Sequence, residues 1–247
     1  MMSWNLQRFF VLCILAALGI LSLFHPTTKT LWEPIDQGFF RIVNGWISKT
    51  PFWQHFWAMA NHRLTDFLIE DLGFVLFFIW ILYATPAKER LYKGAECLFI
   101  LLYGAFIILI ANELLFRNLL HIQRASPTLV MEECTRLSTH VTWLKIKTES
   151  LKSFPGDHAT TALFSILGFL YLTRGKGVIA WVTCGFGLFL ALPRLVVGAH
   201  WLTDVLIGSG SILILSWALA FCTPLHRYVI DVLYKTLQKL FPKKATL

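Results

Sequence analysis

The sequence predicts an all-α polytopic membrane protein, a bundle of six transmembrane helices with interfacial helices in its first outer loop. The chain has 247 residues, of which 56% are hydrophobic and only 15% charged, whereas soluble domains average about a quarter charged residues. Its mean hydropathy is +0.63. The apolar residues form long continuous runs, whereas barrel strands alternate over about ten residues. This composition excludes an ordinary soluble domain.

The apolar runs place six spans within a single integral membrane domain that covers residues 1–247. Several are shorter than the about 20 residues that cross a hydrocarbon core, so they must extend into their flanks or thin the bilayer. The first run has no small-residue cleavage site at its end, and we interpret it as a retained anchor. The expected spans cover residues 9–28, 71–87, 97–116, 158–173, 177–193 and 203–224.

Basic residues orient these spans. With both termini in the cytoplasm, the whole net charge of +8 falls on the inner side, as the positive-inside rule favours. The basic tail at 227–247 then either lies on the anionic inner leaflet or is simply solvated. We expect no nucleic-acid partner, because the charge serves orientation. The five cysteines have no paired spacing and indicate neither a redox centre nor a metal site.

The first outer loop is rich in Trp and Phe between Trp32 and Trp57. Because indole rings favour the headgroup level, this pattern predicts interfacial helices, although packing of the aromatics against the bundle is the alternative.

Three polar clusters lie where spans meet the outer surface, so separate loops are expected to converge on one site. Singly, each residue has an ordinary interpretation: an interfacial arginine, a satisfied histidine or a helix cap. Together they suggest chemistry. The clusters are Arg117 with Arg124 after the third span, Ser153 to His158 (SFPGDH) before the fourth, and Arg194 with His200 and Asp204 between the fifth and sixth.

The spacing of these residues predicts phosphate chemistry. His200 and Asp204 at i and i+4 would share a helix face, so that the carboxylate holds one imidazole nitrogen and leaves the other nucleophilic. Arg117 and Arg124 would present two guanidiniums on one face if the third span continues that far, and Arg194 adds a third cation. Guanidinium forks match phosphate oxygens.

The opening of the fourth helix completes the expected site. Gly156 lets the backbone approach closely, and the first amides of the helix favour an anion. His158 can protonate a leaving oxygen. Asp157 caps the helix, pairs with an arginine or favours a phosphate acceptor over water, and the sequence leaves these roles open. No metal or other cofactor is expected, because the arginines repel a cation.

These clusters resemble the three signatures of the membrane type 2 phosphatidic acid phosphatase superfamily: Lys-x6-Arg-Pro, Pro-Ser-Gly-His and Ser-Arg-x5-His-x3-Asp. The match spans residues 117 to 204. Departures from the signatures are Arg117 for lysine, Ala125 for proline, Gly156-Asp157 for Ser-Gly and Pro193 for serine. The resemblance implies a phosphorylated nucleophile at His200, an orienting partner at Asp204, an acid at His158, and a phosphate site formed by Arg117, Arg124, Arg194, Gly156 and Asp157.

The strings LWEPID, RASPTL and PRLVVGAHWLTD are similar to the branch of this superfamily that forms lipid A 1-diphosphate. That similarity implies membrane lipid substrates: a polyprenyl diphosphate donor, undecaprenyl diphosphate, with lipid A or water as acceptor. The active site would face the periplasm at the cell inner membrane.

Two alternatives stay open. The first is a lipid phosphatase that hydrolyses undecaprenyl diphosphate, phosphatidylglycerol phosphate or lipid A phosphate. The second is a non-enzymatic phospholipid-binding transporter, which predicts charged residues deep within the spans. On the expected boundaries, Glu113 is the only anion near a span interior.

Overall fold

The structure is a computed structural model that describes residues 4–175 and 178–242. Within these residues the chain is helical, and its sole strand-like feature is an isolated bridge between Arg124 and Lys152, so the all-α prediction is confirmed. The elements are α1 (Leu6–Phe24), α2 (Pro26–Asn44), α3 (Pro51–Ala60), α4 (Arg63–Thr65), η1 (Asp66–Asp71), α5 (Leu72–Ala84), α6 (Arg90–Ile108), η2 (Leu109–Leu119), α7 (Pro127–Val130), α8 (Leu137–His140), α9 (Asp157–Thr173), α10 (Val178–Val196), η3 (Asp204–Ser209), α11 (Gly210–Phe221) and α12 (Leu225–Leu240).

Four helical stretches in the described chain are long and apolar enough to cross a membrane, and Trp181–Val196 is a shorter apolar helix. The four are Leu6–Phe24, Arg63–Ala84, Arg90–Phe116 and Asp204–Phe221. Large apolar side chains on them are widely exposed, Trp80 and Leu206 among them, as expected for surfaces that face lipid. The chain is therefore a multi-pass membrane protein.

Several helix bounds differ from the expected spans; the third stretch begins at Arg90 rather than at residue 97, and two further differences have identifiable reasons. The first helix ends at Phe24 rather than at residue 28, because Pro26 begins α2 at the position where proline favours a new helix. The second span begins at Arg63 rather than at 71, and so includes Asp66 and Glu70. A helix accommodates these carboxylates because both contact partners inside the protein.

Helix α9 lies inside the bundle, in contact with α10, α6 and α11. Small residues allow the close approach: a Cβ at Gly168 would lie 2.7 Å from Ile100 of α6, as is usual where membrane helices pack. Buried aromatic side chains such as Phe99 and Phe164 fill the space around α9. This packing fixes the N-terminus of α9, where the predicted site residues begin.

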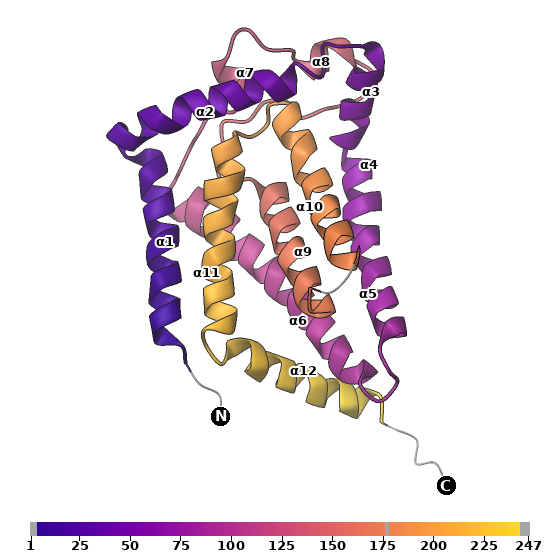
Figure 1. The fold of residues 1–247 in the computed structure, drawn as a ribbon. Coiled ribbons are helices and arrows are strands. Elements are labelled where there is room, and N and C mark those ends of the chain that lie inside the picture. Colours follow the sequence, from indigo (N-terminus) through magenta and orange to yellow (C-terminus); the bar gives the residue numbers. More distant parts are fainter. Residues whose placement is uncertain (1–3, 176–177, 243–247) are drawn as a thin grey trace.

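One end of the bundle is covered by α2, α3, α7 and α8 (Figure 1). Helix α2 runs across the ends of α11 and α10, and buries Phe40 and Val43. The first loop is therefore helical, as expected, in α2 and α3. At the opposite end, α12 lies across the bundle and packs against α6. Residues 227–240 of the basic tail therefore belong to a packed helix, and residues 243–247 lie outside the described chain.

Candidate active site

The loop before α9 and the turn after α10 enclose a small cavity of about 70 Å³. Gly198 ends α10 with a φ of +81°, and a Cβ there would lie 2.6 Å from Thr128, so only glycine suits this turn. The turn delivers His200 to the cavity opposite the start of α9. The cavity is lined by Lys147, Ser150, Lys152, Asp157, His158, Arg194, Ala199 and His200.

The imidazole of His200 is held by a main-chain carbonyl. Its Nδ1 lies 2.6 Å from the carbonyl oxygen of Ser153. A carbonyl can only accept, so Nδ1 carries the proton and Nε2 keeps its lone pair. Burial lowers the pKa of His200, and this effect exceeds the opposite effect of the negative charge on Asp204. The lowered pKa favours the neutral ring. His200 thus has the protonation state of a nucleophile.

Gly156 lies directly against this ring. A Cβ at Gly156 would lie 3.4 Å from Nδ1 of His200 and 3.2 Å from the Cβ of Ala159. The start of α9 can therefore approach the nucleophile closely, as the sequence predicts. Asp157 opens α9 and lines the same cavity.

Asp204 does not hold His200 through a hydrogen bond, so the predicted contact between the two was wrong. The reason is local: helical geometry resumes only at Leu202, so His200 precedes the helix and shares no face with Asp204. The fully buried carboxylate instead accepts the Trp201 amide at 2.8 Å and Nη1 of Arg124 at 2.6 Å.

Arg124 joins three segments that are far apart in sequence. The third membrane helix continues through η2 and ends at Leu119, so Arg124 does not share a helix face with Arg117 as expected. Arg124 instead lies in a non-helical segment that forms a bridge with Lys152. Its Nη2 binds Asp36 of α2 at 2.6 Å, and it lines a second cavity of about 290 Å³ beneath α2. The backbone of Arg117 is helical, and its side chain lies outside the described part of the structure.

Arg194 lines the small cavity together with His158. Nearly buried, at 8% exposed, it donates from Nη1 to the Asn61 carbonyl at 2.9 Å and to the Asn61 side chain. Its Nη2 lies 2.5 Å from Asp66 and 3.2 Å from Nε2 of His158. Helix α10 thus supplies a cation whose direction is set by the segment before α5.

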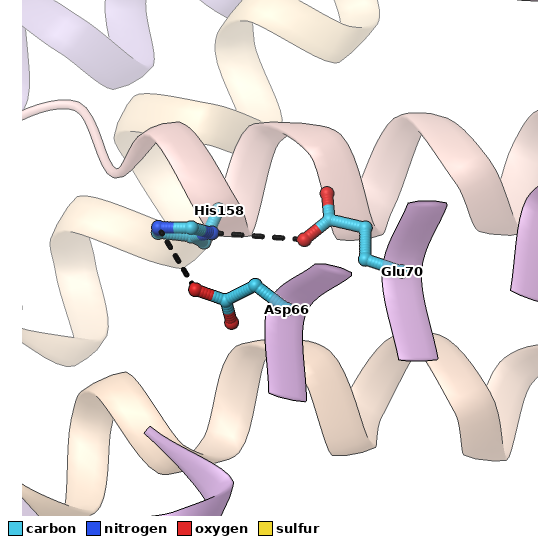
Figure 2. Close-up of side chains that lie close together, drawn as sticks. All are labelled: Asp66, Glu70 and His158. Atoms are coloured by element: carbon cyan, nitrogen blue, oxygen red, sulfur yellow. Dashed lines mark ion pairs between the residues drawn. The ribbon is translucent and has the colours of Figure 1, made fainter. Parts of the chain in front are cut away.

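His158 lies between two carboxylates of η1, as Figure 2 shows. Its Nε2 is 3.9 Å from Asp66, and its Nδ1 is 3.7 Å from Glu70. Contrary to expectation, Glu113 is therefore not the only anion near a span interior, because Asp66 and Glu70 lie within the stretch Arg63–Ala84. The spacing of Asp66 and Glu70 at i and i+4, directly before an apolar run, was the signal in the sequence that could have located them.

Asp66, Glu70 and His158 each offer one ligand atom, and these atoms lie within 4.8 Å of one another. The donor set suits a divalent cation. However, Nη2 of Arg194 is hydrogen-bonded to both Asp66 and His158, and its positive charge disfavours a metal ion there. The geometry fits a proton-transfer cluster better than a metal centre.

Sequence reasoning brought together Arg194, His158, His200, Asp157 and Gly156, and these do meet at one cavity. It missed the residues that position them, because a partner far away in sequence leaves no local pattern. These are Asp36, Asn61, Asp66 and Glu70, together with Lys147 and Lys152 in the cavity lining.

A helical membrane protein with a neutral histidine, an arginine and two lysines around a small cavity has the composition of a phosphoryl-transfer enzyme. A family model described as the PAP2 superfamily matches residues 97–229. The chain is also 30% identical over 237 residues to the lipid A 1-diphosphate synthase of Escherichia coli (strain K12), with 94% of each chain covered. No solved structure matches. The chain belongs to the PAP2 superfamily and is an enzyme of the phosphotransferase or phosphatase class.

Proposed function

We propose that this protein is a membrane phosphotransferase that moves a phosphate from undecaprenyl diphosphate to the 1-phosphate of lipid A through a phosphohistidine at His200. The observation that carries the proposal is the contact of His200 Nδ1 with the Ser153 carbonyl, which leaves Nε2 nucleophilic inside a cavity with cationic walls. The similarity to a lipid A 1-diphosphate synthase over 94% of the chain supports the choice of donor and acceptor.

In the first half-reaction, Nε2 of His200 attacks the terminal phosphorus of the donor and forms an N–P bond. The bond from phosphorus to the bridging oxygen breaks, and His158 gives its Nε2 proton to that oxygen as undecaprenyl phosphate leaves. Arg194, the lysines of the cavity and the first amides of α9 near Gly156 and Asp157 stabilise the charge on the transferred group.

In the second half-reaction, a phosphate oxygen of lipid A attacks the same phosphorus and the N–P bond breaks. The proton of the attacking phosphate returns to His158, so both histidines regain their starting states. Asp204 acts at a distance, through its charge and by holding the Trp201 amide beside His200. Arg124 supports Asp204, and Arg117 is proposed for the phosphate clamp on the resemblance alone.

A groove of about 310 Å³ between α5, α6 and α9 supports a lipid substrate. It is lined by Phe74, Phe78, Ile100 and Phe164, with Glu70 at one edge. Glu70 of the groove lies 3.7 Å from His158 of the cavity, so a prenyl chain lying in the groove would have its diphosphate on the side of His158 and His200.

We also propose that residues 1–247 form one domain that crosses the inner membrane six times. Helices α9 and α10 are the two short spans added to the four long ones, and α2 lies on the outer surface. The termini are cytoplasmic, because the end opposite α2 carries α12 and its lysines (Figure 1). The site then faces the periplasm.

The test uses purified protein and labelled undecaprenyl diphosphate, with and without lipid A. Labelled lipid A diphosphate and an acid-labile phosphoenzyme are expected, and both are lost in His200→Ala. His226→Ala is the matched control, because His226 lies on α12 and bonds the Ala220 carbonyl far from the site. Transfer by His200→Ala contradicts the mechanism. Rapid phosphate release without acceptor instead identifies a lipid phosphatase, and failure to trap any phosphoenzyme restores the transporter alternative.

A further inference from the structure

Glu70 is a nearly buried carboxylate, 9% exposed, inside the membrane helix Arg63–Ala84. Ionisable groups within membrane helices are costly and are usually functional. Within the described chain its ion-pair contact is with Nδ1 of His158, at 3.7 Å. Figure 2 shows this carboxylate on the side of the imidazole ring opposite to Asp66.

The proton on the His158 ring can be assigned from its other neighbour. Nη2 of Arg194 lies 3.2 Å from Nε2 of His158. A guanidinium can only donate, so Nε2 accepts and the ring proton is on Nδ1, facing Glu70. In serine proteases a carboxylate hydrogen-bonded to the far nitrogen of the catalytic histidine fixes its tautomer and orientation; here the carboxylate occupies the same side of the ring at 3.7 Å and acts through its charge.

Asp66 has a different role in this cluster. Its carboxylate binds Arg194 at 2.5 Å and lies 3.9 Å from the His158 ring. The Asp66 charge is therefore matched by Arg194, whereas the Glu70 charge faces the imidazole. Asp66 and Glu70 of η1 thus face different side chains, Asp66 the guanidinium of Arg194 and Glu70 the imidazole of His158.

We propose that Glu70 is a positioning residue for His158. Its carboxylate lies 3.7 Å from Nδ1, so its negative charge favours the proton on that nitrogen, orients the ring with Nε2 toward the leaving oxygen, and compensates the positive charge of the ring before the proton is given up. Nε2 takes up the proton of the attacking phosphate at the end of each turnover, which makes the ring cationic; as the P–O bond of the next donor breaks, this proton passes to the leaving oxygen, and the ring returns to the neutral Nδ1-protonated form of the structure. The inference rests on the proposed function, in which His158 is the acid.

The test compares two substrates that need the acid to different degrees. A prenyl diphosphate releases a phosphate monoester, which is stable without added protonation, whereas a prenyl monophosphate of equal chain length releases an alkoxide. In Glu70→Gln, phosphoenzyme formation should fall roughly 10–100-fold with the monophosphate and no more than about threefold with the diphosphate. Glu149→Gln is the matched control, because this outer carboxylate is exposed and pairs with Arg136.

Equal losses with the two substrates, or no loss with either, would overturn the proposal, as would a wild-type enzyme inert toward alkyl monophosphates. If Glu70→Gln does not fold, Glu70→Asp replaces it, with a smaller loss and the same substrate bias. Loss on chelation that is restored by Mg²⁺ would make the cluster a metal site and reject the inference. Activity of His200→Ala would instead reject the proposed function, so the two failures are distinguishable.

Discussion

Arg124 binds the buried carboxylate of Asp204 at 2.6 Å with one guanidinium nitrogen, and through the other it binds Asp36 at 2.6 Å. Thr203 donates its amide and its hydroxyl to Asp36 as well. The surface helix α2 is therefore joined to the turn that presents His200. We expect that breaking the contacts of Asp36 with Arg124 and Thr203 disturbs the position of His200, although Asp36 itself does not line the cavity that contains His200.

Asp36→Ala should destabilise the protein by about 2–4 kcal/mol, because Nη2 of Arg124 and the amide and hydroxyl of Thr203 lose their buried acceptor while Arg124 keeps its pair with Asp204. The measurement is thermal or denaturant unfolding in detergent, with Glu33→Ala as the control. Glu33 lies on the same helix, and its pair with Lys29 is exposed. Equal stability of the two variants would contradict the structural role of Asp36.

Arg194→Lys should lower kcat/KM by about 100-fold or more, since one ammonium cannot reproduce contacts to Asn61, Asp66 and His158 together. Steady-state kinetics with the lipid donor measures the loss. Arg136→Lys is the control, because Arg136 forms an exposed pair with Glu149. Wild-type activity of Arg194→Lys would show that charge alone suffices.

Gly156→Ala should fold, because the φ of −75° at this position suits alanine. The added methyl group would lie 3.4 Å from Nδ1 of His200 and crowd the nucleophile. We expect at least about a tenfold loss of phosphoenzyme formation with little change in the unfolding temperature. Gly38→Ala, where a Cβ meets nothing within 4 Å, should keep full activity.

The pH dependence follows from the lowered pKa of His200. Because burial holds this pKa below 6.5, the ring stays neutral and nucleophilic on acidification past pH 6.5, and phosphoenzyme formation should decline only below that. Protonation favours the unfolded state, so the stability that the neutral ring contributes is present above pH 6.5 and lost as pH falls toward the folded pKa. Unfolding measured against pH should show a weaker acid loss in His200→Gln.

Lys152→Gln should raise KM for the diphosphate donor several-fold, because Lys152 adds positive charge to the cavity wall. Lys145→Gln tests a lysine of the same loop that does not line the cavity, and its KM should stay unchanged. The effect of Lys152→Gln should shrink at high salt, since Lys152 is exposed and its field is screened. A salt-independent loss would indicate a different role.

The helical class and most of the span positions follow from the apolar runs, because such runs are visible in the sequence without any knowledge of tertiary contacts. The motif residues around Gly156, His158 and His200 were predicted because their spacing is local. Glu70 and Asp66 were missed because charge was used to end the second span, and a buried charge is tolerated once it has a partner. The predicted contact between His200 and Asp204 was wrong because the sequence does not show that the helix begins only after His200, at Leu202.

Hydropathy and local spacing can be read along the chain, so the sequence is enough to identify a membrane protein and to select the residues proposed for phosphate chemistry. The tertiary structure alone decided which atom restrains each of them: the Ser153 carbonyl for His200, Glu70 for His158, Asp66 for Arg194 and Asp36 for Arg124. These partners come from other helices and loops. Their choice depends on how α2, η1 and α9 pack, and packing is a property of the whole bundle rather than of any segment.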